Sequence, residues 1–171
     1  MTYAAYYFSP LGRIVLMSDG TALTELDFSE GVPEASAVHT QKDLPVFGEV
    51  CRWLDVYFAG RDPGALPPLA PHGTAFQQAV WKILRRIPYG TTTTYGRIAA
   101  HIAAARGGRM SAQAVGGAVG RNPISILIPC HRVIGADSSL TGYAGGLDKK
   151  EALLRLEGVQ LPPTGVETLR G

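Results

Sequence analysis

Several features that would direct a protein to other compartments or chemistries are missing from this sequence. It has only two cysteines, Cys51 and Cys130, which lie far apart and form no Cys-x-x-Cys pair. This spacing indicates free thiols in a reducing compartment rather than a disulfide framework. No apolar run approaches the ~20 residues that span a bilayer, and no charged-then-apolar leader is present. We therefore expect a cytoplasmic protein that has no membrane segment.

The sequence also lacks a cluster of metal ligands. His39, Cys51 and His72 in the first half do not have the spacing of zinc ligands. We expect neither a metal nor another cofactor.

Charge is divided unevenly along the 171 residues. Residues 1–72 carry four basic and nine acidic side chains, a net charge of −5, and residues 73–171 carry twelve and five, a net charge of +7. A basic half joined to an acidic half favours a polyanion as the partner of the second half.

The first half has the pattern of a small α+β domain. Three segments have an apolar or alternating pattern, which are Tyr3–Phe8, Arg13–Ser18 and Ala22–Phe28. Turn sequences around Pro10 and Gly20 separate them. Apolar residues then recur at helical spacing from Val46 to Phe58. We predict an antiparallel sheet with one covering helix over residues 1–72, ending in a linker rich in proline and glycine. Nothing in this domain suggests chemistry.

The second half, residues 73–171, is predicted to be helical. Thr74 can cap a helix that Pro88 stops, a second helix starts near Tyr95, a third starts at Ser111, and a last one starts at Asp148. Two short helices joined by a glycine-bearing turn are typical of a helix-turn-helix, so we assign that motif to the second and third.

The segment after the third helix carries the strongest chemical signal. Ile124–Ile128 is an apolar run between two prolines, which predicts a short buried strand, and Pro129, Cys130 and His131 follow at once. A free thiol has a pKa of about 8.5 and reacts as the thiolate, so it needs a base, and His131 is the neighbouring candidate. The pattern predicts a nucleophilic cysteine.

The sequence Pro-Cys-His-Arg-Val at residues 129–133 resembles the acceptor motif of the O6-alkylguanine-DNA alkyltransferases. Further blocks match this family in its order, and they are Phe76–Trp81, Ile87–Gly90, Thr94–Tyr95, Ala114–Ala118, Asn122–Pro123, Thr141–Gly146 and Lys150–Gly158. The resemblance implies a ribonuclease H-like amino-terminal domain, a helix-turn-helix DNA-binding domain, and single-turnover repair of alkylated guanine.

The resemblance also implies catalytic roles. Cys130 would be the alkyl acceptor, His131 its base through a bound water, and Glu157 the group that holds the other imidazole nitrogen. Tyr95 would donate a hydrogen bond toward the departing guanine. Asn122 would link the helix-turn-helix to the cysteine turn. Without the resemblance, core packing would explain Tyr95, a plain turn would explain Asn122, and a solvated helix end would explain Glu157.

The third predicted helix has an unusual composition for a DNA reader. After its cap, Ser111, small residues such as Ala112, Ala114 and Gly116 dominate it, whereas reading the major groove needs long polar side chains. Composition alone fits close helix packing as well as a smooth contact with DNA. The resemblance implies a sequence-blind fit in the minor groove, with the damaged base turned out of the stack. Gln113 stands where the family has an arginine that fills the vacated space, so it can wedge but lacks the charge.

Other contacts to DNA or substrate follow from position in the family motif. Because Gln113 lacks the charge, we expect either weaker extrusion of the base or assistance from Arg109 or Arg121 nearby. Arg132 and Val133 follow the Cys-His pair directly. Tyr143 is expected to wall the base pocket. Ala144 replaces a serine of the family, so any contact to O6 there would come from its backbone N–H. The expected partner is double-stranded DNA that contains alkylated guanine, bound by a monomer, with cooperative loading left open.

Two other readings of the sequence are an alkylguanine-binding relative without activity and a cysteine hydrolase. Cys130 argues against the first because such relatives lack the acceptor. The second leaves the helix-turn-helix and the basic half unexplained. The range of alkyl groups, including repair of O4-alkylthymine, is left open by the sequence.

Overall fold

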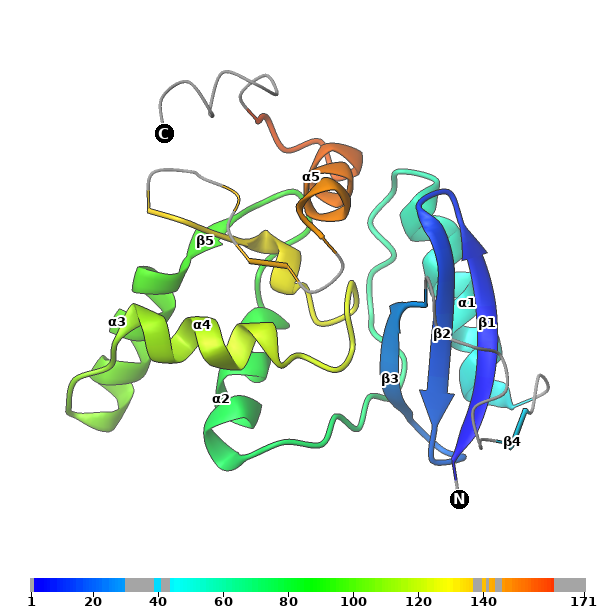
Figure 1. Ribbon diagram of the computed structural model, residues 1–171, viewed down its shortest axis with the longest axis horizontal. Coiled ribbons are helices and arrows are strands. Elements are labelled where there is room, and N and C mark those ends of the chain that lie inside the picture. The colour runs from blue at the N-terminus through cyan, green and yellow to red at the C-terminus, as the bar shows by residue number, and fades with distance from the viewer. Residues whose placement is uncertain are drawn as a thin grey trace.

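The structure is a computed structural model that describes residues 2–29, 39–40, 44–136, 140, 142–143 and 146–161. Its elements run along the chain as a sheet, one helix and a largely helical second part (Figure 1). Among these residues no helix is both long and apolar enough to cross a membrane.

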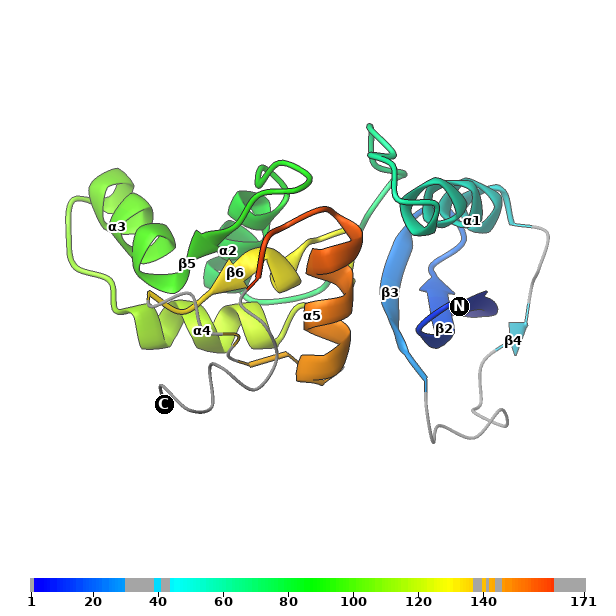
Figure 2. The same ribbon diagram turned by 90° about the horizontal axis from the view of Figure 1, so that it is seen from above.

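The amino-terminal part is an α+β unit. Its sheet has the order β3-β2-β1-β4, and the strands are β1 (Tyr3–Ser9), β2 (Gly12–Ser18), β3 (Leu23–Phe28) and β4 (His39–Thr40). The first three strands pair antiparallel, as predicted, and the two-residue β4 pairs parallel to β1. Helix α1 (Pro45–Phe58) lies along one face of the sheet (Figure 2). Buried side chains of β2 and α1, such as Leu16 and Leu54, belong to one core cluster.

The carboxy-terminal part contains the predicted helices. They are α2 (Ala75–Leu84), α3 (Tyr95–Arg106), α4 (Ala112–Gly120) and α5 (Leu147–Leu156). A parallel pair of two-residue strands, β5 (Thr93–Thr94) and β6 (Val133–Ile134), and the 3₁₀ turn η1 (Cys130–Arg132) complete it. Thr74 and Gln77 form a reciprocal capping box at the start of α2. The predicted helix starts at Thr74, Tyr95 and Ser111 therefore agree with the structure.

The two parts of the chain share hydrogen bonds through the outer edge of β3. Leu23 pairs with the linker, donating to the Pro68 carbonyl at 2.9 Å and accepting from Ala70 N at 2.8 Å. Leu26 donates to the Pro123 carbonyl at 2.9 Å and accepts from Ser125 N at 2.9 Å. The domain boundary at residue 72 stays a prediction. Residues on both sides of this boundary form hydrogen bonds with the same edge strand, β3.

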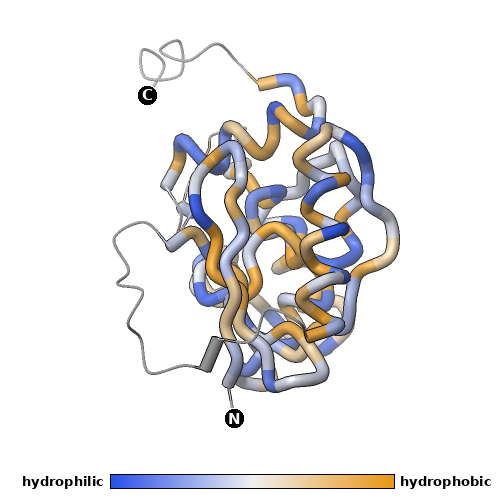
Figure 3. Tube along the Cα trace, turned by 90° about the vertical axis from the view of Figure 1, so that its right-hand side faces the viewer, coloured by the Kyte–Doolittle hydropathy of each residue, from blue (hydrophilic) through white to orange (hydrophobic). Residues whose placement is uncertain are grey.

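Hydrophobic stretches recur in the strands and in the helices (Figure 3). Buried residues of both parts, including Leu26, Val50, Trp81 and Ile128, belong to one continuous cluster. The two parts of the chain therefore fold around a shared core.

The predicted strand at Ile124–Ile128 is wrong. Ile124 makes an isolated bridge with Leu26, but the chain then turns, and Ile126 adopts a positive φ of 71°. All five residues are nevertheless buried. A continuous apolar run indicates burial on every side, which a turn between two packed parts satisfies as well as a strand does.

Gly73 makes room for the central side chain of the second part. Trp81 is 1% exposed, and its indole N–H donates to the Ala118 carbonyl at 2.9 Å. A Cβ added at Gly73 would come within 2.6 Å of Cζ3 of this ring. A larger residue at position 73 therefore has to displace a buried, hydrogen-bonded indole.

We predict that Gly73→Ala lowers the free energy of unfolding by about 1–3 kcal/mol, as overpacking does elsewhere. Gly108→Ala is the control, because no heavy atom lies within 4 Å of a Cβ at that position, and it should change stability by less than ~0.5 kcal/mol. Urea unfolding of both variants checks this. Equal midpoints for the two would contradict the packing argument.

Candidate active site

Cys130 lies in a turn that the end of α4 holds in place. The Asn122 side chain donates to the Ile128 carbonyl at 2.7 Å and accepts from Ile124 N at 3.0 Å, so it fixes both ends of the segment before the cysteine. Cys130 is 7% exposed. Burial raises the pKa of its thiol to about 11, although the Asn122 hydrogen bond and the charge of Lys150 act in the opposite direction. At neutral pH the resting thiol is protonated and needs a base.

The neighbouring histidine forms a buried pair with Glu157. His131 is fully buried, and its Nε2 lies 2.6 Å from Glu157 Oε2. A carboxylate oxygen at this distance requires a proton on Nε2, so the lone pair of the neutral ring lies on Nδ1. Within the described part of the chain this Nδ1 is buried and has no hydrogen-bond partner. The ring is therefore set to accept a proton at Nδ1.

Glu157 lies at the carboxy-terminal end of α5, and its carboxylate is enclosed by donors. Oε1 accepts from Gly90 N at 3.0 Å and from Arg132 Nε at 2.8 Å, and Oε2 accepts from Tyr57 OH at 2.6 Å. Burial alone would raise the pKa of Glu157, but His131 and Arg132 outweigh it and lower the pKa to about 2. The carboxylate is thus ionised at neutral pH and can stabilise an imidazolium.

Burial lowers the pKa of His131, and the Glu157 carboxylate opposes that shift. The imidazole is therefore neutral in the resting protein. This protonation state is the one that a base needs.

Arg132 lies elsewhere than predicted. Its guanidinium points into the protein, where Nη1 donates to the Ile87 carbonyl at 2.7 Å and Nε pairs with Glu157. The residue is 7% exposed. A buried side chain with these partners supports the carboxylate and does not reach a DNA surface.

A pocket of about 280 Å³ opens beside the thiol. Its lining includes Cys130 and four residues that were predicted from the sequence, which are Tyr95, Gly116, Asn122 and Tyr143. Val133, which was predicted to contact DNA or substrate, is fully buried and does not line this pocket. Ala144 lies outside the described residues. The fold thus brings residues from α3, α4, the cysteine turn and the following loop around one cavity.

The exposed side of α4 has the predicted composition. Ser111 caps the helix by accepting from Ala114 N at 3.0 Å, and Ala112, Gln113 and Ala114 are exposed, as is Arg121. No acidic residue occurs between positions 63 and 136. The exposed part of α4 therefore carries uncharged and mostly small side chains.

Two site residues were missed from the sequence. Lys150 is fully buried, and its ammonium donates to the Val133 carbonyl at 2.6 Å and lies 6.0 Å from the centre of the Tyr95 ring. Burial lowers its pKa to about 8. Its spacing from Glu157, seven residues along α5, would have placed both on one helix face. The other, Tyr57, lies among the apolar positions of α1 and has no distinguishing signal in the sequence.

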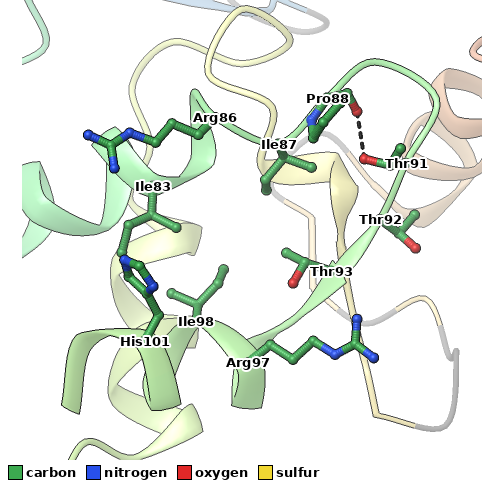
Figure 4. A pocket seen from close by; sticks show the side chains of 10 residues that line it. All are labelled: Ile83, Arg86, Ile87, Pro88, Thr91, Thr92, Thr93, Arg97, Ile98 and His101. Carbon is green, nitrogen blue, oxygen red and sulfur yellow. Dashed lines mark hydrogen bonds between the residues drawn. The ribbon is translucent and has the colours of Figure 1, made fainter. Parts of the chain in front are cut away.

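A second pocket, of about 320 Å³, lies between α2 and α3 (Figure 4). Isoleucines 83, 87 and 98 line it together with Arg86 and Arg97. It contains none of the predicted site residues. Several of the predicted site residues instead line the pocket beside Cys130.

Comparison with known proteins identifies the family. Residues 75–159 match the DNA-binding domain of 6-O-methylguanine DNA methyltransferase, and residues 2–66 match its ribonuclease-like domain. The chain belongs to this methyltransferase family. It is 46% identical over 170 residues to the methylated-DNA–protein-cysteine methyltransferase of Haemophilus influenzae, covering 98% of this chain and 93% of the relative. The prediction of family and of enzyme class is confirmed.

Solved structures of the family support the fold assignment. The Mycobacterium tuberculosis O6-methylguanine methyltransferase superposes with a TM-score of 0.81 at 41% identity, covering all of both chains. A structure of the same organism's methyltransferase in complex with DNA gives a TM-score of 0.78 at 42% identity, covering 91% of this chain and 92% of that one. The predicted α+β fold with a helical DNA-binding part is confirmed, while the roles of individual residues stay predictions.

The lowered pKa of Glu157 makes a prediction about acid stability. The unfolded chain takes up the Glu157 proton near its ordinary pKa of 4.5, whereas the folded protein resists protonation down to about 2. The free energy of unfolding should therefore fall over this range by roughly 3 kcal/mol from this group. Glu157→Gln should lose that part of the pH dependence and be less stable at pH 7.

Denaturant unfolding at several pH values from 6 to 2.5 measures this slope. Glu151→Gln removes a carboxylate from the same helix that is partly exposed and paired with Arg155, and it should keep the wild-type slope. A Glu157→Gln protein with an unchanged slope would contradict the prediction.

Proposed function

We propose that Cys130 accepts the alkyl group of O6-alkylguanine in duplex DNA and keeps it. The observation that carries this proposal is that the Cys130 thiol borders the 280 Å³ pocket while the buried His131–Glu157 pair follows it directly in the chain. Within the methyltransferase family this chain has both the acceptor residue and a base, so a binding-only role is disfavoured.

The transfer is an in-line displacement. The thiol proton passes to Nδ1 of His131, through a bound water, and Glu157 stabilises the resulting imidazolium. The thiolate attacks the alkyl carbon, a C–S bond forms, and the bond from carbon to O6 breaks with its electron pair moving to the guanine. Tyr95 donates a hydrogen bond to the departing base. The product is a thioether that water does not readily cleave, so each molecule reacts once.

The DNA side of the proposal uses the exposed face of α4. A smooth helix in the minor groove positions the protein without reading sequence, and the damaged base is turned into the pocket between Tyr95 and Tyr143. Turning a base out costs a few kcal/mol, least for a poorly paired lesion. Gln113 fills the vacated space. The partner is double-stranded DNA containing alkylated guanine, bound by one protein chain, and the proposal needs no metal or cofactor.

A cysteine hydrolase is the alternative function for a site with these residues. A directly adjacent Cys-His pair is poor geometry for the usual hydrolase dyad, and His131 Nδ1 makes no hydrogen bond to Cys130 among the described residues. The absence of acidic residues from positions 63–136, which include α4 and the cysteine turn, favours DNA as the partner instead.

We predict that Cys130→Ser transfers no label from duplex DNA that carries O6-[³H]methylguanine, because the serine hydroxyl is too weakly acidic for this base. Wild-type protein should take up one methyl group per chain and then stop, and Cys51→Ser should do the same. Label remaining on DNA with the wild-type protein would support a binding role, and continued ester turnover would support the hydrolase.

We predict that Gln113→Arg binds undamaged duplex more tightly and with a steeper salt dependence. One additional cation near the phosphates should make the slope of log K against log salt more negative by about 0.9. Fluorescence anisotropy at several salt concentrations measures this slope, and Gln113→Ala, which adds no charge, is the control. Identical slopes for the two variants would place residue 113 away from the DNA.

A further inference from the structure

We propose that Tyr57, on α1 of the amino-terminal part, is a positioning residue for the His131–Glu157 pair, so that the amino-terminal part completes the active site. The inference rests on the proposed role of Cys130. It assigns a function to a part of the chain in which the sequence indicated no chemistry.

The hydroxyl of Tyr57 reaches the centre of the relay. It donates to Glu157 Oε2 at 2.6 Å and lies 3.4 Å from His131 Nε2. Tyr57 is fully buried and lies 100 residues before Glu157 in the chain. A single phenol thus touches both members of the pair that is to handle the proton of Cys130.

The ring of Tyr57 is held on several sides. It stacks on Trp53 with centroids 5.4 Å apart and planes at 9°, and Tyr89 packs edge-on at 6.1 Å. The His131 ring lies edge-on at 6.5 Å. Because these contacts fix the phenol, its hydroxyl has a fixed place relative to α5 and the cysteine turn.

A phenol can only donate to an ionised carboxylate, so the hydrogen-bond directions are determined. Oε2 accepts hydrogen bonds from Tyr57 OH and from His131 Nε2–H. Oε1 accepts hydrogen bonds from Arg132 Nε and from Gly90 N. Each oxygen has two donors, and the carboxylate cannot rotate without losing one. Tyr57 therefore keeps Oε2 directed at Nε2, which leaves the lone pair of His131 on Nδ1.

Removing the hydroxyl should weaken this alignment without creating a cavity in the core. Tyr57→Phe keeps the ring contacts but leaves Oε2 with one donor, so the carboxylate can turn away from the imidazole. Loss of one charge-assisted hydrogen bond of this kind should slow alkyl transfer by about 10- to 100-fold. DNA binding should be unaffected, since α1 contributes nothing to the exposed face of α4.

The test compares Tyr57→Phe with Tyr7→Phe in a Cys51→Ala background that leaves Cys130 as the one thiol. Tyr7 is a matched control because its hydroxyl also donates to a carboxylate, Asp55 at 2.7 Å, in the same part of the chain. Two rates are measured at a temperature where every variant is folded. The first is the rate of methyl transfer from O6-methylguanine duplex. The second is the rate of Cys130 alkylation by iodoacetamide without DNA, measured at several pH values.

Tyr57→Phe should slow both reactions by about 10- to 100-fold and move the alkylation profile to higher pH, because the imidazolium that accompanies the thiolate is less well stabilised. Tyr7→Phe should match the parent protein. In a Glu157→Gln background the effect of Tyr57→Phe should largely disappear, since the hydroxyl acts through that carboxylate.

Rates for Tyr57→Phe within about twofold of the parent would overturn the inference. So would a loss that is just as large in the Glu157→Gln background, because that result indicates a general structural role. A parent protein that alkylates normally with iodoacetamide but takes no methyl from DNA would refute the proposed function instead, and the two failures are therefore distinguishable.

Discussion

The rest of the structure depends on one buried carboxylate. Glu157 is 6% exposed and accepts hydrogen bonds from four other residues, which are Tyr57, Gly90, His131 and Arg132. An ionised carboxylate inside a protein is strongly destabilising unless it is paired and fully hydrogen-bonded. The four donors come from α1, the loop after α2, and the cysteine turn. The same interaction that orients the base therefore also requires these segments to meet around the end of α5.

The protonation states of Cys130 and His131 differ between the resting protein and the proposed reactive state. Burial raises the pKa of the Cys130 thiol to about 11 and also disfavours a charged His131. The uncharged thiol and imidazole are thus the stable resting pair. The charge of Lys150 lowers the pKa of the Cys130 thiol and so favours the thiolate, although it also disfavours the imidazolium. Glu157 raises the pKa of His131 and so favours the imidazolium. A protein that reacts once benefits from a thiol that is unreactive until then.

Charge and shape are distributed to suit a nucleic-acid partner. The stretch from residue 63 to residue 136 has no acidic side chain, and it contains α2, α3, α4 and the cysteine turn. Small exposed residues on α4 allow close approach of the helix backbone to DNA, while Val115, Ala118 and Val119 pack inward. Helix packing therefore accounts for the buried side of α4, and the small exposed residues on its other side are available for the proposed DNA contact.

Local sequence by itself determined strands β1, β2 and β3, the starts of α2, α3 and α4, and the acceptor motif. Turn residues, the Thr74 and Ser111 caps and the apolar spacing act within a few residues, so they can be read without the fold. Tertiary structure alone decided that Ile124–Ile128 turns, that Arg132 faces inward, and that Tyr57 joins a carboxylate 100 residues away. Apolar periodicity reports which side chains are buried, but a buried polar group is paired only when distant segments meet. Which donors surround Glu157 is therefore a property of the packed molecule.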